Sequence, residues 1–268
     1  MYTLVWFQPG VKTIKTRPET IARGLLSATR VLSLGRRKCS VTESTVTAQR
    51  PSADELEALN REFETAPAGK VVQWAVDAFG GALVLAASFE DIVLIDLATK
   101  LAPGIEVIFL DTGAHFPETL EFVEEIRARY NLNLTVTKPG PEAASHPCGS
   151  EQCCQFRKVA PLRQAVQGSA AWLTSLKRVD APSRAAAPIV SWDDAFGLVK
   201  VNPLVTWTND DVASYLADHG LPVHPLTYRG YRSIGCAPTT RPVADGEDPR
   251  AGRWAGLDKS ECGLHVAR

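Results

Sequence analysis

The chain has 268 residues, of which 45% are hydrophobic and 22% are charged, and its formal net charge is −1. This composition is that of an ordinary globular protein and excludes the disordered and fibrous classes. No run approaches the roughly 18 apolar residues that a membrane span requires, so we predict a soluble protein that binds no membrane.

The first segment of the chain differs in charge from the rest. Residues 1–40 contain eight Lys or Arg and one acidic residue, Glu19, so they carry +7 and the rest of the chain carries −8. We expect residues 1–45 to be a basic leader that is disordered or not translated. Translation would start near Val41, because Met1 is the only methionine and a polar sequence typical of a natural N-terminus follows. An organelle targeting peptide is the alternative, whereas the lack of a continuous apolar stretch excludes a secretory signal.

Predicted helices and strands alternate after this leader. Ser52, with a glutamate three residues later, begins a capping-box pattern that predicts a helix over 52–65. Apolar runs predict strands at 81–88 and 105–113, and the stretch 91–101 between them is amphipathic. The order strand, helix, strand indicates a parallel sheet.

A further helix and strand follow this unit. Pro117 stands at the first position of a predicted helix over 116–132, and a strand is predicted at 134–138. The side chains expected on the buried face of this helix are Leu120, Val123 and Ile126.

The second half of the body repeats the alternation and then loses it. A helix over 153–166, interrupted by Pro161, precedes the remaining predicted strands, which are 171–176, 187–192 and 198–204. Thr208 caps a last helix that stops at Gly220. We therefore predict an α/β fold with a parallel twisted sheet flanked by helices. Its nucleotide-binding domain would span 46–225, and a cluster-like loop with a mobile catalytic tail would span 226–268.

Polar residues follow two of the predicted strands. Ser88 and Asp111 come after the first and second strand, and ligands of such sheets bind beyond the carboxyl ends of the strands. Ser88 can present its hydroxyl and neighbouring backbone N–H groups to an anion. Simple helix capping is the alternative for Ser88, and bracing of a turn is the alternative for Asp111.

Six cysteines, two of them adjacent, favour metal binding or thiol chemistry in a reducing cytoplasm over a secreted disulfide framework. Cys153 and Cys154 with more distant thiolates are typical of an iron–sulfur site, and two buried thiols are the alternative. Cys236 in "GCAPTT" supplies a third ligand, but Thr239 occupies the fourth position of the expected C-x-x-C pair. Cys148 is either a substitute ligand or an ordinary loop thiol.

Basic side chains gather in sequence around these cysteines and suit a small, dense anion. A nucleic acid would need a broader basic face. The residues concerned are Lys158, Arg184, Arg250 and Arg253, whereas Arg157 and Arg241 are more readily explained as solvated charge. Near the end of the sequence, Cys262 in "ECGLH" is poorly explained as core filling and better explained as a thiol that must travel.

These motifs together resemble the assimilatory adenylyl-sulfate and phosphoadenylyl-sulfate reductases, within the adenine-nucleotide alpha-hydrolase-like superfamily. The resemblance runs from about 80 to 265 and rests on seven motifs, which are "SFEDIVL", "FLDTGAHFPETL", "CCQFRKVAPL", "WLTSLKRVDAPSRA", "SIGCAPTTRP", "GEDPRAGRWAG" and "ECGLH".

The resemblance implies a mechanism in which Cys262 attacks the sulfur of adenylyl sulfate, AMP leaves, and thioredoxin releases sulfite from a thiosulfonate on the cysteine. It also implies that His265 helps to position or activate the tail. The implied substrate-binding residues are Ser88, Lys158, Arg184, Arg250 and Arg253. We expect no C-terminal thioredoxin-like domain, so the chain resembles the bacterial type that uses external thioredoxin. Glutaredoxin is the alternative electron donor, and a homo-oligomer is a possible assembly.

Departures from the family pattern leave alternatives open. With Thr239 in the fourth position, we expect a 4Fe-4S cluster on Cys153, Cys154 and Cys236, completed by a hydroxyl, water or substrate, and an empty site is the alternative. In the substrate loop, family members carry Gly, Arg, Gln and Ser where this chain carries Ser175, Lys177, Asp180 and Ala181, so an altered substrate preference is plausible. The competing functions are a cluster-free phosphoadenylyl-sulfate reductase and a non-catalytic nucleotide- or cluster-binding sensor. A thiouridine-forming or ATP-cleaving relative is disfavoured, because 88–91 lacks the phosphate loop it would need.

Overall fold

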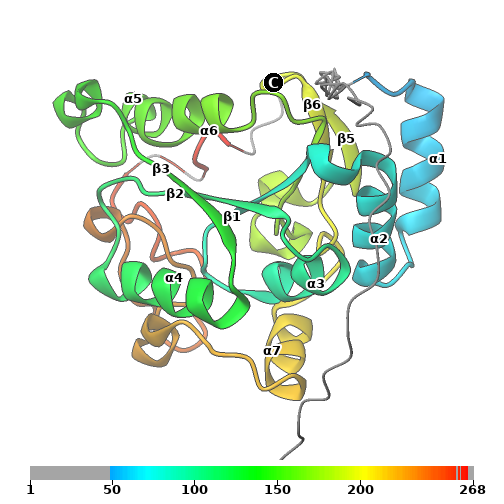
Figure 1. The fold of residues 1–268 in the computed structure, drawn as a ribbon. Coiled ribbons are helices and arrows are strands. Elements are labelled where there is room, and N and C mark those ends of the chain that lie inside the picture. Colours follow the sequence, from blue (N-terminus) through cyan, green and yellow to red (C-terminus); the bar gives the residue numbers. More distant parts are fainter. Residues whose placement is uncertain (1–48, 258, 260, 265–268) are drawn as a thin grey trace, which may run out of the picture. The chain divides into compact units, whose positions relative to one another are not determined.

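The computed structural model describes residues 49–257, 259 and 261–264 (Figure 1). The predicted leader and His265 lie outside the described residues. The α-helices are α1 (Ala53–Phe63), α2 (Ala68–Phe79), α3 (Val93–Leu101), α4 (Pro117–Tyr130), α5 (Glu151–Cys154), α6 (Ala160–Ala165) and α7 (Asn209–Asp218). The strands are β1 (Leu83–Ala87), β2 (Glu106–Leu110), β3 (Asn133–Thr137), β4 (Ala171–Leu173), β5 (Val190–Asp193) and β6 (Leu198–Val201).

The six strands form one sheet in the order β3-β2-β1-β4-β6-β5 (Figure 1). All neighbouring pairs are parallel except β5 and β6, which are antiparallel. The prediction of an α/β fold with a parallel sheet flanked by helices is confirmed, and β5 is the antiparallel strand of this mostly parallel sheet. The reason is the short β5–β6 connection, whose turn includes Gly197 at φ +73°, because so short a link can join only antiparallel strands.

Successive side chains along a strand point to opposite faces of the sheet, so the core consists of one cluster on each face. Leu83 and Leu85 of β1 pack into the larger cluster, together with apolar residues of α1, α2, α3, α4 and α7. Val84, between them, packs into a smaller cluster with Leu162 of α6 and Val166. Figure 1 shows α6 on the opposite side of the sheet from α3 and α4. The sheet is thus covered on both faces, as expected for parallel strands.

The helix boundaries follow local sequence signals, with one error in the predicted buried face. Ser52 and Glu55 form the predicted capping box of α1, and Pro117 opens α4. Leu120 is 40% exposed, so its predicted burial is wrong. The residues of α4 that face the core share the spacing i, i+3, i+4, i+7 and are Thr119, Phe122, Val123 and Ile126. Leu120 lies one residue past this face, which corresponds to about 100° around a helix.

A helical segment of mixed geometry carries the adjacent cysteines. The N-cap Ser150 accepts a hydrogen bond from the backbone N–H of Cys153 at 3.1 Å and begins α5. A π-helical turn, Gln155–Val159, then leads into α6, whose first turn contains Pro161. The interruption predicted at Pro161 therefore takes the form of a wider turn just before it. Such turns are frequent at functional sites.

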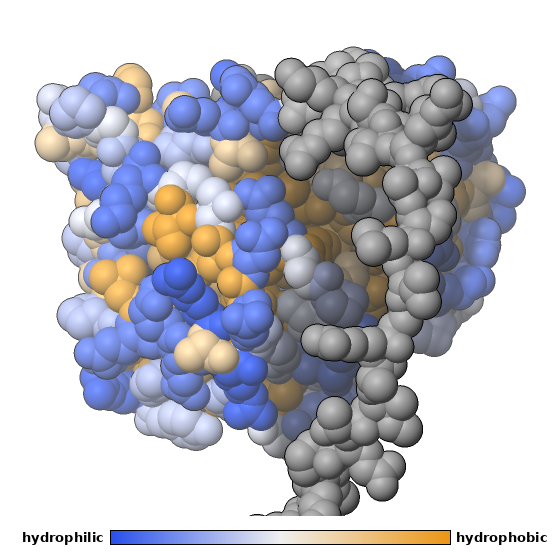
Figure 2. Space-filling model, viewed as in Figure 1, coloured by the Kyte–Doolittle hydropathy of each residue, from blue (hydrophilic) through white to orange (hydrophobic). Residues whose placement is uncertain are grey.

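The surface seen in Figure 2 is mostly hydrophilic, with apolar side chains in smaller patches between the polar ones. Among the residues that the structure describes, no helix combines the length and the apolar character needed to cross a membrane.

Candidate active site

A cleft opens where the strand order reverses, between β1 and β4. The chain passes from β1 to β2 on one side, whereas β4 lies on the other side of β1. The cleft has a volume of about 190 Å³ and is lined by Ser88 and Asp91 after β1 and by Ser175 and Lys177 after β4. Ligands of doubly wound sheets bind at such a switch point, beyond the carboxyl ends of the strands.

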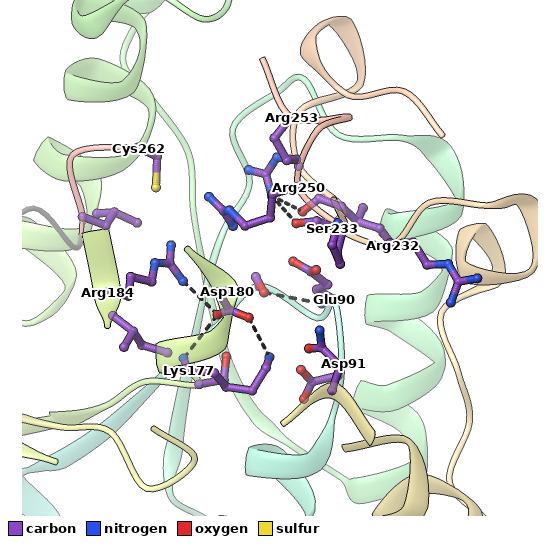
Figure 3. Close-up of a pocket in the computed structure, with 18 of the residues that line it drawn as sticks. Glu90, Asp91, Lys177, Asp180, Arg184, Arg232, Ser233, Arg250, Arg253 and Cys262 are labelled. Atoms are coloured by element: carbon purple, nitrogen blue, oxygen red, sulfur yellow. Dashed lines mark hydrogen bonds and ion pairs between the residues drawn. The ribbon is translucent and has the colours of Figure 1, made fainter. Parts of the chain in front are cut away.

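The cleft gathers basic side chains from distant parts of the sequence. Figure 3 shows five of them, which come from the loop after β4 and from the C-terminal segment. The basic residues that line the cleft are Lys158, Lys177, Arg184, Arg232, Arg250 and Arg253. Four of them were predicted from the sequence, and Lys177 and Arg232 were not among the predicted site residues.

Arg253 is held in a fixed orientation within the cleft. Its guanidinium donates hydrogen bonds to Ser233 Oγ at 3.1 Å and to the Ile234 carbonyl at 3.0 Å (Figure 3). The same group lies over the Trp254 ring, 4.7 Å from its centroid. A Cβ added at Gly235 would lie 2.5 Å from this guanidinium, so the backbone approaches it as closely as only glycine permits.

Acidic groups in the cleft offset part of this positive charge. Asp180 lies 3.3 Å from Lys177 Nζ and 3.0 Å from an Arg184 nitrogen (Figure 3). Burial is the largest influence on Glu90 and Asp91 and raises the pKa of both carboxyl groups, against the opposing charge of Lys177. The cleft therefore combines a cationic side with acids that are easier to protonate than usual.

The C-terminal segment is docked against this cleft through an ion pair. Glu261 accepts two hydrogen bonds from Arg184, at 2.7 and 2.8 Å, and a third from Ser183 Oγ at 3.2 Å. Arg250 lies 3.6 Å from the same carboxylate. Bidentate pairing of this kind fixes geometry as well as charge, so Glu261 anchors the residue that follows it.

That residue is Cys262, which is only 8% exposed and points into the cleft (Figure 3). It packs in a small cluster with Cys154 and Trp254. Burial opposes ionisation of the thiol, but the charge of Lys158, the backbone N–H of Leu264 and the charge of Arg253 outweigh it, and the pKa of Cys262 is lowered. A buried thiol with a lowered pKa is typical of a nucleophile.

The remaining described cysteines surround a second, smaller cavity beside the cleft. Cys148, Cys153, Cys154 and Cys236 line it together with Thr239. Lys158 lines both cavities, and its charge interacts with the sulfurs of Cys262, Cys236 and Cys154. Cys153, Cys154 and Cys236 are all less than 9% exposed. The thiols predicted as ligands are therefore brought together.

A tail residue also contacts this cysteine group. Lys259 Nζ donates a hydrogen bond to Cys154 Sγ at 3.2 Å and to the carbonyls of Gly149 and Ser150, both at 3.1 Å. The docked tail thus spans the two cavities, with Lys259 at one and Glu261 at the other. Neither residue was among the predicted site residues, although "KSECGLH" shows both flanking Cys262 in the sequence.

The structure brings most predicted site residues together. Ser88 lines the cleft with all four predicted cations and Cys262. His265 lies outside the described residues. The sequence did not decide whether Cys148 is a cluster ligand or an ordinary loop thiol, and the structure places it with the other cysteines. Its closeness in sequence to the pair "CC" was the one feature that pointed to this position.

No three His, Cys, Asp or Glu side chains within the described residues are arranged to hold a single metal ion. A four-iron cluster makes a different demand, because each cysteine binds a different iron and the four sulfurs need not reach one ion. The donor set of this cavity, soft thiols with nearby cations, suits an iron–sulfur cluster better than a single hard cation.

Comparison with known proteins gives concordant matches. The phosphoadenosine phosphosulfate reductase domain model matches residues 82–242. Adenosine 5′-phosphosulfate reductase of Mycolicibacterium smegmatis is 45% identical over 215 residues, which cover 77% of this chain and 91% of the relative. The reductase of the same name from Streptomyces coelicolor is 41% identical over 227 residues, covering 80% and 96%. The crystal structure of a phosphoadenylyl-sulfate reductase from Candida auris, a phosphate complex, covers 72% of this chain and 100% of its own, with a TM-score of 0.64 at 25% identity.

Proposed function

This chain belongs to the phosphoadenosine phosphosulfate reductase family, and on that premise we propose that it reduces adenylyl sulfate to sulfite and AMP, with thioredoxin as electron donor. The observation that carries the proposal is the position of Cys262, whose thiol points into a cleft lined by basic side chains (Figure 3). Its relatives named adenosine 5′-phosphosulfate reductase support the choice of nucleotide.

In the first step, the Cys262 thiolate attacks the sulfur of the sulfate group. A bond forms between Cys262 Sγ and that sulfur while the bond from sulfur to the bridging oxygen breaks. AMP leaves with the oxygen and the electron pair, and a thiosulfonate remains on the cysteine. The lowered pKa of Cys262 supports this role, because a larger fraction of the thiol is ionised at neutral pH.

In the second step, a thioredoxin thiolate attacks Cys262 Sγ and sulfite leaves. The second thiol of thioredoxin then reduces the mixed disulfide, so that thioredoxin supplies two electrons and Cys262 is restored. Cys262 is too deeply buried in the docked tail to meet a protein partner. We therefore infer that the tail leaves the cleft between the two steps, as lids do in many enzymes.

The basic side chains of the cleft would hold the phosphosulfate group. Lys158, Arg184, Arg250 and Arg253 supply fixed positive charge where the leaving phosphate gains negative charge, and such stabilisation is a large contribution to catalysis. Ser88, at the end of β1, would lie near the nucleotide. In this proposal the domain 46–225 binds the nucleotide, and the segment 226–268 provides two of the arginines and the nucleophile.

The second cavity would hold a 4Fe-4S cluster on Cys153, Cys154 and Cys236. The fit rests on the chemistry of the donor set, three buried thiols beside Lys158. When bound, the cluster would supply a compact, polarisable charged group beside Lys158. Lys158 lines both cavities, and its charge acts on the sulfurs of Cys236 and Cys262. Its part is to hold positive charge between the two cavities.

A sulfite assay with each nucleotide tests the proposal. Phosphoadenylyl sulfate is the alternative substrate, since the Candida auris protein of similar fold is a reductase of that nucleotide and the cleft holds further cations, Lys177 and Arg232. We expect sulfite release with adenylyl sulfate and thioredoxin to exceed release with the 3′-phosphorylated nucleotide. The opposite preference would assign the chain to the second activity, and binding without sulfite release from either nucleotide would favour a sensor.

The anchor of the tail leads to a prediction about the accessibility of Cys262. Glu261→Gln removes the ion pair with Arg184, so the tail should leave the cleft more often. The substitution also removes a negative charge that raises the pKa of Cys262, so the pKa should fall further. Both effects increase the rate at which iodoacetamide alkylates Cys262, and mass spectrometry of the tail peptide measures that rate.

The matched control is Glu57→Gln, which breaks an exposed ion pair with Arg61 at 2.6 Å, away from the cleft. We expect its alkylation rate to equal that of the unmodified protein, because exposed pairs contribute little. Equal rates for the Glu261 and Glu57 variants would show that the ion pair does not anchor the tail.

A further inference from the structure

We propose that Cys148 supplies the fourth thiolate of the cluster, in place of the cysteine that the chain lacks at position 239. The inference rests on the proposed cluster at Cys153, Cys154 and Cys236, and it changes the expected fourth ligand from a hydroxyl, water or substrate to a thiolate of the chain itself.

The position of the Cys148 side chain carries the proposal. Cys148 lines the small cavity together with Cys236, Cys153 and Thr239, and its thiol interacts with the sulfurs of Cys236 and Cys153. The Cys148 sulfur therefore lies beside the very side chain that stands where a fourth cysteine would be expected. All four cysteines line the same cavity.

The loop that carries Cys148 is built for this close approach. Gly149 has φ +96°, a conformation that side chains rarely adopt, and a Cβ there would lie 2.5 Å from Leu257 and 3.2 Å from Thr239. The next residue, Ser150, caps α5, and its backbone N–H donates a hydrogen bond to the Pro147 carbonyl at 3.1 Å. The loop thus brings Cys148 over Thr239 and joins directly to the helix of the cysteine pair.

Ligand chemistry favours the thiol over the hydroxyl. Iron–sulfur clusters are held by cysteine thiolates, and a neutral hydroxyl is a much weaker ligand for this soft site. Thr239 Oγ1 also has a partner within its own turn, the Cys236 carbonyl at 3.4 Å. When the cluster is bound, Cys148 would act as a ligand through its thiolate sulfur.

The test compares four proteins that are purified without oxygen, with iron and acid-labile sulfide measured per chain and the visible spectrum recorded. The unmodified protein should hold about four irons. Cys148→Ser should lose most of its iron, whereas Thr239→Ala should keep it. Cys148→Ser combined with Thr239→Cys should regain iron, because that pair moves the fourth thiolate to the adjacent side chain.

The controls distinguish ligation by Cys148 from a general effect of losing a cysteine, from a failure to fold and from the proposed reductase activity. Cys39→Ser replaces a cysteine of the predicted leader and should leave the iron content unchanged. Full iron in Cys148→Ser, or iron loss in Thr239→Ala, would overturn the inference, and so would an unmodified protein without iron or sulfide. The sulfite assay is read separately, so that reductase activity in an iron-free protein would leave the proposed function standing. The rescue variant also shows whether iron loss in Cys148→Ser reflects the ligand or a failure to fold.

Discussion

Replacement of Cys262 by serine is expected to lower the rate of sulfite formation by at least about 10³-fold, the scale on which loss of a covalent nucleophile acts. Serine keeps the size of the side chain, but its hydroxyl is not ionised near neutral pH. It also cannot form a thiosulfonate that a dithiol could cleave. Sulfite release with adenylyl sulfate and thioredoxin measures the effect.

Two further measurements make this result specific to the nucleophile. Nucleotide affinity should be close to that of the unmodified protein, because the cations of the cleft are unchanged. Without thioredoxin, the unmodified protein should gain the mass of one SO₃ group on the tail peptide, and the serine variant should not. Cys39→Ser is the matched control and should retain full activity. Sulfite formation at the normal rate by the Cys262 variant would refute the proposed mechanism.

Replacement of Lys158 by methionine is expected to lower kcat/KM by about 10² to 10³-fold, as loss of one preorganised charge at a reacting centre does. The pKa of Cys262 should rise as well, because the Lys158 charge favours its thiolate. Since only the thiolate is alkylated, the pH profile of iodoacetamide labelling at Cys262 should move to higher pH. Lys158→Arg keeps the charge and should retain part of the activity.

The matched control for this prediction is Lys138→Met. Lys138 is an exposed lysine whose side chain is 73% accessible and lies 3.5 Å from Asp111, and neither residue lines the cleft. Its replacement should change neither kcat/KM nor the labelling profile, because a surface pair contributes little. An unchanged labelling profile in Lys158→Met would show that Lys158 does not set the pKa of the nucleophile.

Local signals in the sequence were enough to predict many of the elements, but not their orientation in the sheet. Ser52 and Pro117 act within one helical turn, so their effects can be read from neighbouring residues. The antiparallel pairing of β5 depends on which strand lies beside it, which no local pattern specifies. The error at Leu120 has a similar origin, because the rotation of α4 is set by packing of Phe122 against the core.

The candidate site was predictable where motifs name residues, and less so where contacts join distant segments. Cys262 and the arginines stand in recognisable motifs. The role of Glu261 as an anchor of the tail depends instead on its ion pair with Arg184, which lies 77 residues earlier in the sequence. Cys148 was ambiguous for the same reason, since its partners Cys236 and Thr239 lie across a loop that the sequence does not place. Long-range contacts of this kind require the three-dimensional arrangement.

The π-helical turn Gln155–Val159 sets the orientation of the cysteine pair relative to α6. The turn contains an additional residue relative to an α-helix. If the same residues were wound as a regular α-helix, the cysteine pair would be rotated by about 100° relative to α6. Leu162 is fully buried, so α6 is fixed against the sheet, and the rotation would fall on the cysteines. A substitution at Gln155 or Phe156 that straightened the wide turn would therefore turn the thiols away from their cavity, although neither residue lines it.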